Sequence, residues 1–246
     1  MKKTQLFMLH FAGGNRYSFE FIKPLLGVFE VEVLELPGRG GRMNEKLIKD
    51  FETASYDIFS QLSGKLESPD FLIYGHSMGA YLTLKVASML ENKGTPPLAI
   101  IVSGNIGPTT KRNTNVMRHT MEKDQFITEL EKLGGVPDEI ISNPEFFNYF
   151  EPILRADFEI AENNELEFHL PINLPIFAIM GSQEDRVAEI NNWGRFTTSE
   201  FDSAVLEGNH FFIHHHAKKI ASIIKTCYGN AKNNFMFHEN RSLPES

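Results

Sequence analysis

The sequence predicts an α/β fold with a mostly parallel central sheet, helices on both faces and a helical lid insertion. Short apolar runs alternate along the chain with segments whose apolar residues recur at helical spacing, the pattern of a parallel sheet covered on both sides. A glycine-flanked turn at residues 75–79 joins one apolar run directly to a helical segment. The length of 246 residues suits one such domain with an inserted lid.

Six apolar runs are expected to form the strands of the sheet, because each has the length and punctuation of a strand. The run at 98–102 is continuously apolar, as in a strand that is buried on both faces. The expected strands are residues 5–10, 31–36, 71–74, 98–102, 176–180 and 203–206. The expected helices outside the lid are residues 17–26, 51–66, the segment from the 75–79 turn to 92, 188–196 and 213–228.

The alternation of strands and helices stops between residues 108 and 174. Helical segments follow one another there without a strand, and an insertion of this size favours a lid over the active face of the sheet. Its aromatic residues each suit core packing, but together they suit an acyl chain; they are Phe146, Phe147, Tyr149, Phe150 and Phe158. The expected parts are a core of residues 1–107 and 175–228, a lid of residues 108–174 and a polar, mobile tail of residues 229–246.

The charge and composition exclude several classes of protein. The net charge is −8, whereas binding to nucleic acid needs a surplus of lysine and arginine. No apolar stretch approaches the roughly 20 residues that span a bilayer, and residues 1–9 lack a signal-peptide cleavage pattern, so we expect a cytoplasmic protein. The single cysteine, Cys227, excludes an intrachain disulfide and a metal site made of several cysteines.

Residues 75–79 read Gly-His-Ser-Met-Gly, the G-x-S-x-G pattern of a nucleophile elbow. In that motif a serine lies on a tight turn between a strand and a helix, and the two glycines leave room for the turn. Ser77 is therefore the candidate nucleophile. The backbone NH of Met78, at the start of the helix, would face the anion that forms when a serine attacks a carbonyl group.

A second NH group for this anion is expected after the first strand. Phe11, Ala12, Gly13 and Gly14 follow that strand, and small residues let the backbone turn with its NH groups exposed. The expected donor is Ala12, with Gly13 as the alternative.

A serine nucleophile needs a histidine base, and the histidine needs a carboxylate to orient it. In this type of fold the serine, the acid and the histidine follow one another along the chain. His210 follows the last expected strand and is the expected base. Asp185, shortly after the strand at 176–180, is the expected acid because the turn before a helix favours aspartate; Glu184 is the alternative.

Other polar groups have weaker functional interpretations. Three consecutive histidines, 214–216, would point in different directions on a helix, so no metal site is expected. Arg39 and Arg42, in a glycine-rich loop, are expected to face solvent, with a substrate phosphate as the less favoured alternative. No cofactor is expected.

With these residues assembled, the chain resembles the type II thioesterases of the α/β-hydrolase superfamily, the stand-alone editing enzymes of nonribosomal peptide and polyketide synthases. The matching motifs are H-F-A-G-G-N at 10–15, L-P-G-R-G-G-R at 36–42, Y-G-H-S-M-G-A at 74–80, G-G-V-P at 134–137, L-R-A-D-F at 154–158, G-S-Q-E-D at 181–185 and G-N-H-F-F-I at 208–213.

The resemblance implies hydrolysis of acyl groups from the phosphopantetheine arm of carrier proteins. It also implies that Ser77, Asp185 and His210 form a catalytic triad, with Met78 and Ala12 supplying the oxyanion NH groups. The expected partners are acyl or peptidyl carrier protein domains, and the protein is expected to be a monomer that binds neither nucleic acid nor membrane. A carboxylesterase of free small esters and a non-catalytic carrier-binding module are the alternatives.

Overall fold

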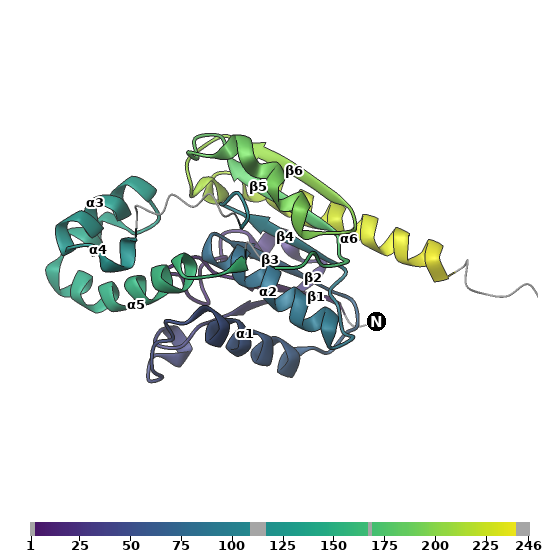
Figure 1. Ribbon diagram of the computed structural model, residues 1–246, viewed down its shortest axis with the longest axis horizontal. Helices are drawn as coiled ribbons and strands as arrows, with labels where there is room; N and C mark the ends of the chain where they lie inside the picture. The colour runs from purple at the N-terminus through teal and green to yellow at the C-terminus, as the bar shows by residue number, and fades with distance from the viewer. Residues whose placement is uncertain (1–2, 109–116, 167–168, 240–246) are drawn as a thin grey trace, which may run out of the picture.

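One parallel sheet forms the centre of the molecule (Figure 1). The computed structural model describes residues 3–108, 117–166 and 169–239. Within these ranges six strands pair in the order β2-β1-β3-β4-β5-β6, and every neighbouring pair is parallel. They are β1 (Thr4–Leu9), β2 (Phe29–Leu34), β3 (Phe71–His76), β4 (Ala99–Ser103), β5 (Ile176–Gly181) and β6 (Phe201–Leu206). The predicted α/β class is confirmed.

Helices cover both faces of the sheet. Alternate residues of a strand point to opposite faces, so Ile73 of β3 packs in one apolar cluster while its neighbours Leu72 and Tyr74 pack in the other. Helices α1 and α2 belong to the first cluster, and α6 belongs to the second. The α-helices are α1 (Phe51–Lys65), α2 (Met78–Asn92), α3 (Lys123–Leu133), α4 (Asp138–Ser142), α5 (Pro144–Glu162) and α6 (Ala217–Glu239).

Two segments that were predicted as helices take other forms. Residues 17–26 form turns that end in the 3₁₀ helix η1 (Lys23–Leu26), because Pro24 lacks a backbone NH and its ring disfavours a preceding helical turn. Residues 188–196 lie in the 3₁₀ helix η5 (Val187–Phe196), in which asparagine and glycine are weak α-helix formers. Its Trp193 is fully buried.

The last helix is longer than predicted. Helix α6 continues to Glu239, well into the segment that was expected to be a mobile tail. Ala231 is buried there, and the Lys232 ammonium group pairs with the carboxylate of Asp70, just before β3. These contacts hold the helix beyond Gly229, and the remainder of the predicted tail, residues 240–246, lies outside the described residues.

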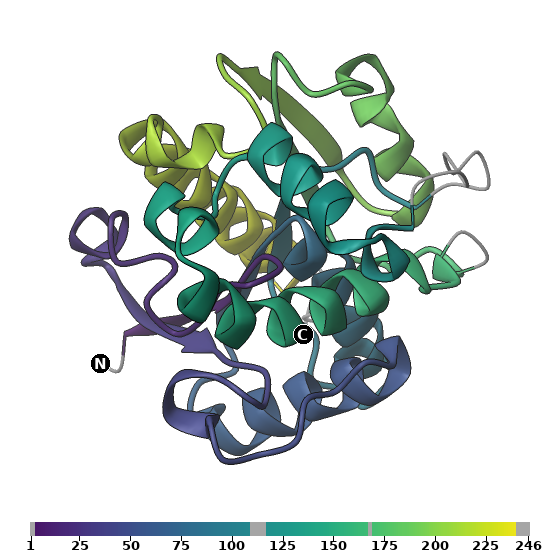
Figure 2. The ribbon, with the colours of Figure 1, turned by 90° about the vertical axis from the view of Figure 1, so that its left-hand side faces the viewer.

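The lid helices α3, α4 and α5 lie together over one end of the sheet (Figures 1 and 2). They enclose a small apolar core of their own, made of Phe126, Leu130, Phe147 and Leu154. Helix α5 contains Pro152, and the part beyond it contributes Ile160 to the main cluster beneath α1 and α2. The helix therefore joins the lid to the core, while the division of the chain into an independent lid and core stays a prediction.

The start of α2 approaches the end of β1 so closely that only glycine fits. A Cβ atom on Gly79 would overlap the backbone carbonyl oxygen of Leu9 and lie 2.7 Å from that of His10. In contrast, a Cβ atom on Gly64, in α1, would meet no atom within 4 Å. Packing thus requires glycine at position 79 but leaves space for a side chain at position 64.

We expect Gly79→Ala and Gly64→Ala to change stability in opposite directions. Gly79→Ala should lower the free energy of unfolding by about 1–3 kcal/mol, because backbone must move to admit the methyl group. Gly64→Ala should raise it by about 0.5–1 kcal/mol, because alanine loses less conformational entropy in a helix. Urea unfolding of both variants tests this, and a stabilising Gly79→Ala would contradict the packing described.

Candidate active site

Ser77 lies on the turn between β3 and α2 with its backbone in a strained conformation. Its φ of 56° and ψ of −116° make it the non-glycine residue with positive φ in the described part of the chain. The turn is held on both sides, because the Ser77 NH donates to the Ser103 carbonyl at 2.7 Å and the Asn105 amide donates to the Ser77 carbonyl at 2.9 Å. The sequence prediction of a nucleophile elbow thus corresponds to a real strand–turn–helix.

The Ser77 hydroxyl and a carboxylate lie on opposite sides of the His210 ring. His210 Nε2 is 2.9 Å from Ser77 Oγ, and His210 Nδ1 is 2.9 Å from Glu184 Oε2. The His210 side chain is 18% exposed and that of Glu184 is 10% exposed. Such an arrangement can move a proton from a hydroxyl to an imidazole that a carboxylate orients.

The acid beside His210 is Glu184, so the expectation of Asp185 in this position is wrong. A tight turn follows β5, in which the Gly181 NH donates to Glu184 Oε1 at 2.8 Å. That bond turns the other carboxylate oxygen toward the imidazole, while Asp185 is exposed. The longer side chain one position earlier therefore reaches His210.

The loop after β1 leaves the Ala12 NH group available beside the elbow. The Gly13 NH donates to Asp157 Oδ2 at 2.7 Å, and the Gly14 NH donates to the Phe11 carbonyl at 2.9 Å. No hydrogen bond among the described residues uses the Ala12 NH. This favours Ala12 over Gly13 as the second oxyanion donor, with Met78 at the start of α2 as the first.

A buried histidine, His76, lies beside the His210 ring. His76 is fully buried, its Nδ1 is 2.8 Å from Ser103 Oγ, and its ring centroid is 5.2 Å from that of His210. Within the described residues its Nε2 has no hydrogen-bond partner. Burial holds the pKa of His76 well below its usual range, so the ring is neutral and packs against His210 as an apolar surface.

The lid touches the chain beside the base. The loop between α3 and α4 crosses the Phe211 ring at Gly135, whose φ is +88° and whose added Cβ atom would overlap that ring. The Phe211 ring centroid in turn lies 4.9 Å from that of Phe11, in the loop after β1. This contact explains the glycine at 135, the φ of +74° explains the one at 134, and the contact brings the lid next to His210.

Neither arginine of the 36–42 loop is free to meet a substrate phosphate. Arg39 is 4% exposed and binds both carboxylate oxygens of Asp157, at 2.5 and 2.7 Å. Arg42 binds Asp57 and Glu45, and these hydrogen bonds raise its pKa. The expectation that Arg39 faces solvent is wrong because its partner lies far along the chain, in α5.

The three consecutive histidines do not converge on one point. His214 lies against Phe211 with the rings 7° from parallel, and His216 Nε2 is 2.7 Å from the Glu207 carbonyl oxygen. In the described ranges no group of three histidine, cysteine, aspartate or glutamate residues could hold a metal ion.

A search of the same ranges finds no helix with the length and apolar character needed to cross a membrane.

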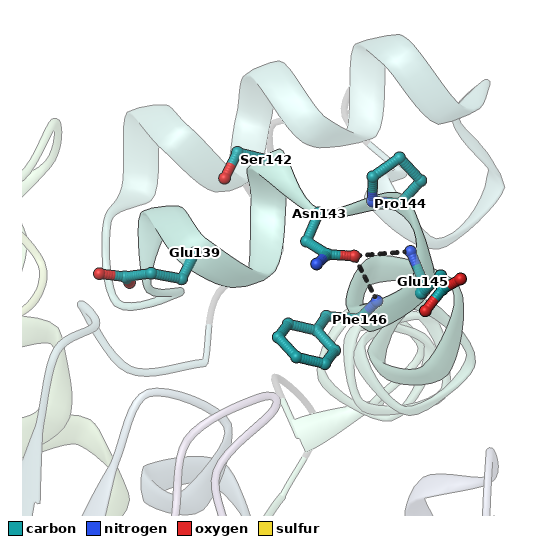
Figure 3. Close-up of a pocket in the computed structure, with 6 residues that line it drawn as sticks. All are labelled: Glu139, Ser142, Asn143, Pro144, Glu145 and Phe146. Atoms are coloured by element: carbon teal, nitrogen blue, oxygen red, sulfur yellow. Dashed lines mark hydrogen bonds between the residues drawn. The ribbon is translucent and has the colours of Figure 1, made fainter.

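The lid has a surface pocket whose lining does not include Ser77, Glu184 or His210 (Figure 3). It surrounds the start of α5, where Asn143 Oδ1 accepts hydrogen bonds from the NH groups of Glu145 and Phe146. Its lining is Glu139, Ser142, Asn143, Pro144, Glu145 and Phe146. Phe146 and Tyr149 are each 54% exposed, whereas Phe147 is buried in the lid core, so the lid aromatics divide between core and surface.

His10, at the end of β1, is a buried neutral histidine. It is 2% exposed, its Nε2 accepts the Leu36 NH at 3.4 Å, and its Nδ1 is 2.8 Å from the Phe11 carbonyl oxygen. Burial, followed by the nearby Arg39 charge, lowers the pKa of His10 to about 4.

This shift predicts a loss of stability in mild acid. Between pH 6.5 and 4 the unfolded chain binds a proton at His10 that the folded chain does not, so the free energy of unfolding falls as the pH falls. His10 alone should contribute about 2–3 kcal/mol to the loss between pH 6.5 and 4.5. Urea unfolding at both pH values should give a smaller difference for His10→Gln than for the wild type, and an equal difference would contradict the assignment.

Comparison with known proteins identifies the family. Residues 4–228 match the family model of the thioesterase domain. A Brevibacillus parabrevis protein named linear gramicidin dehydrogenase LgrE is 31% identical over 228 residues, which cover 90% of this chain and 86% of the relative. Its name describes a dehydrogenase, whereas the family model and two similar solved structures are thioesterases.

The solved structures share the fold over nearly their whole length. RedJ, a thioesterase of the prodiginine pathway in Streptomyces coelicolor, has a TM-score of 0.83 and 26% identity, covering 92% of this chain and 86% of that one. BorB, a type II thioesterase of the borrelidin biosynthetic cluster, has a TM-score of 0.81 and 26% identity, covering 92% and 93%. The chain therefore belongs to the thioesterase family, as a type II thioesterase with the α/β-hydrolase fold.

Proposed function

We propose that this protein hydrolyses acyl groups from the phosphopantetheine arm of carrier proteins, with Ser77 as nucleophile, His210 as base and Glu184 as the orienting acid. The observation that carries the proposal is the hydrogen-bonded line from Glu184 through His210 to Ser77, with 2.9 Å at each step. The Met78 and Ala12 NH groups are the proposed oxyanion donors.

In the first half of the proposed reaction, an acyl group moves to the enzyme. His210 Nε2 accepts the Ser77 proton as Oγ attacks the thioester carbonyl carbon, and the two NH groups bind the oxygen that becomes negative. The tetrahedral adduct then breaks its carbon–sulfur bond, and the His210 imidazolium gives its proton to the departing thiol. Glu184 stabilises the imidazolium and fixes its orientation.

In the second half, water releases the acid. His210 takes a proton from the water molecule that attacks the acyl-serine, and the same NH groups bind the second oxyanion. Breaking the bond to Oγ frees a carboxylic acid, and the proton from His210 restores the Ser77 hydroxyl. Because water is the only co-substrate, the proposed reaction needs neither a metal nor a cofactor.

Carrier protein domains are the proposed partners. The prodiginine and borrelidin pathways of the solved relatives support a role beside a biosynthetic assembly line. We further propose that the protein acts in the cytoplasm, where such a role would place it, and that it acts as a monomer.

The substrate class can be tested with one acyl group in three forms: on a carrier protein, on free pantetheine and as a nitrophenyl ester. We expect the highest kcat/KM for the carrier-bound thioester, and Ser77→Ala should lower kcat by at least about 10⁴-fold. The exposed Ser199→Ala is the matched control and should keep wild-type rates.

Two results would overturn the proposal in different ways. A preference for the nitrophenyl ester, with no gain from the carrier, would make the protein a carboxylesterase with the same triad. Unchanged hydrolysis by Ser77→Ala would remove the serine mechanism itself.

Neighbouring acidic residues allow a sharp test of the acid. Glu184→Gln should lower kcat by about 10²–10⁴-fold, because a neutral amide neither stabilises the imidazolium nor enforces its tautomer. Asp185→Asn, one position later on an exposed turn, should change kcat less than about threefold. Labelling of Ser77 by a fluorophosphonate should fall in parallel with kcat. The reverse order of the two variants would restore Asp185 as the acid.

A further inference from the structure

A buried ion pair connects the lid to the loop after β1. Asp157, on α5, accepts hydrogen bonds from Arg39 Nη2 at 2.7 Å and from Arg39 Nη1 at 2.5 Å. Its Oδ2 also accepts the Gly13 NH at 2.7 Å. Three separate parts of the chain, after β1, after β2 and in the lid, therefore meet at one carboxylate.

Burial makes this pair costly, which indicates a role beyond holding the fold. The Asp157 side chain is fully buried and that of Arg39 is 5% exposed. Desolvating two charges consumes much of the energy that their attraction returns, so a matched apolar pair would often be as stable. What an apolar pair cannot do is accept a hydrogen bond from a backbone NH in a defined direction.

The Arg39–Asp157 pair hydrogen-bonds two consecutive residues of the loop after β1. Asp157 takes the NH of Gly13, and Arg39 Nη1 lies 3.3 Å from the carbonyl oxygen of Gly14, to which it donates. Gly13 has a φ of +77°, a conformation that favours glycine and that the bond to Asp157 holds in place. With these groups fixed, the NH of the preceding Ala12 makes no hydrogen bond to the described residues.

The apolar side of α5 supports the same loop. A Cβ atom on Gly13 would lie 2.5 Å from Leu154 Cδ2, one turn before Asp157 on the helix. The loop therefore contacts α5 through both the Leu154 side chain and the Asp157 carboxylate.

We infer that Asp157, held by Arg39, is the positioning residue of the oxyanion hole. It fixes the loop at 11–14 so that the Ala12 NH points at the developing oxyanion. Because Asp157 belongs to α5, the direction of this NH then depends on the position of α5. The inference rests on the proposed function, because it assigns the Ala12 NH to the acyl-transfer step. Asp157 itself touches no reacting atom.

The decisive variant replaces both charges by apolar groups of similar size, Arg39→Met with Asp157→Leu. The fold should survive because no buried charge is left unpaired. We expect kcat for the carrier-bound thioester to fall by about 10²–10³-fold, the usual effect of losing one oxyanion donor, while KM changes less than about threefold. The midpoint of thermal unfolding should fall modestly, because the Gly13 NH and the Gly14 carbonyl lose a partner while no charge is left buried alone.

A second readout separates positioning from general damage. A trifluoromethyl ketone analogue of the acyl thioester adds to Ser77 and places an oxyanion in the hole, so its affinity should fall by the same factor as kcat. A hydrolysis-resistant thioether analogue has no oxyanion and should bind as it does to the wild type. A merely structural defect would weaken both analogues together, and that result would overturn the inference.

The matched control lies two residues further along the same helix. Glu159 approaches Lys49 at 3.9 Å in a partly exposed pair that also joins the lid to the core. Glu159→Gln breaks that link without touching the loop after β1, and it should leave kcat and the affinity for the ketone unchanged. A loss equal to that of the double variant would assign the effect to lid attachment in general and would overturn the inference.

A fallback covers failure of the double variant to fold. Arg39→Lys keeps the charge, but an ammonium group cannot bind both carboxylate oxygens in the planar geometry of arginine. Its kcat and its affinity for the ketone should fall together, by about tenfold. If Arg39→Lys folds and keeps the wild-type kcat, the inference is overturned but the proposed function stands. If Ser77→Ala still hydrolyses the substrate, the proposed function itself is removed.

Discussion

The contact between the first turn of α2 and the end of β1 is the constraint on which the site depends. Gly79 lies against the carbonyl oxygens of Leu9 and His10, so the helix that follows the serine and the loop that follows β1 are brought together. The same tight turn holds Ser77 at positive φ and leaves the Met78 NH at the start of a helix, where no helical carbonyl accepts it. The close approach of two backbone segments, which only glycine at 79 permits, therefore fixes the relative positions of the serine turn and the loop after β1.

The parallel sheet supplies the rest of the arrangement. The carboxyl ends of parallel strands lie along one edge of a sheet, and the loops after β1, β3, β5 and β6 carry Ala12, Ser77, Glu184 and His210, respectively. The loops after β5 and β6 are joined by backbone hydrogen bonds from Ser182 to Leu206 and from Gln183 to Gly208. These bonds fix the Glu184 loop and the His210 loop to one another independently of the turn that carries Ser77.

The sequence predicted what local patterns determine and missed what distant partners determine. Ser77 and His210 were found because glycines mark their turns, and the strands were found because each is a short, largely apolar run between turn residues. The acid was misplaced by one residue, since only the bond from the Gly181 NH shows which carboxylate turns inward. Arg39 was expected in solvent because its partner, Asp157, belongs to another part of the chain, and no local pattern joins the two.

Helix α5 belongs to two packing groups at once. Leu154 packs in the lid core and Ile160 packs in the main core, and both lie beyond Pro152. Proline carries no backbone NH, so α5 lacks one internal hydrogen bond at residue 152. Asp157 lies between these two anchors, so the segment of α5 that contacts the loop after β1 is braced by both apolar clusters at once.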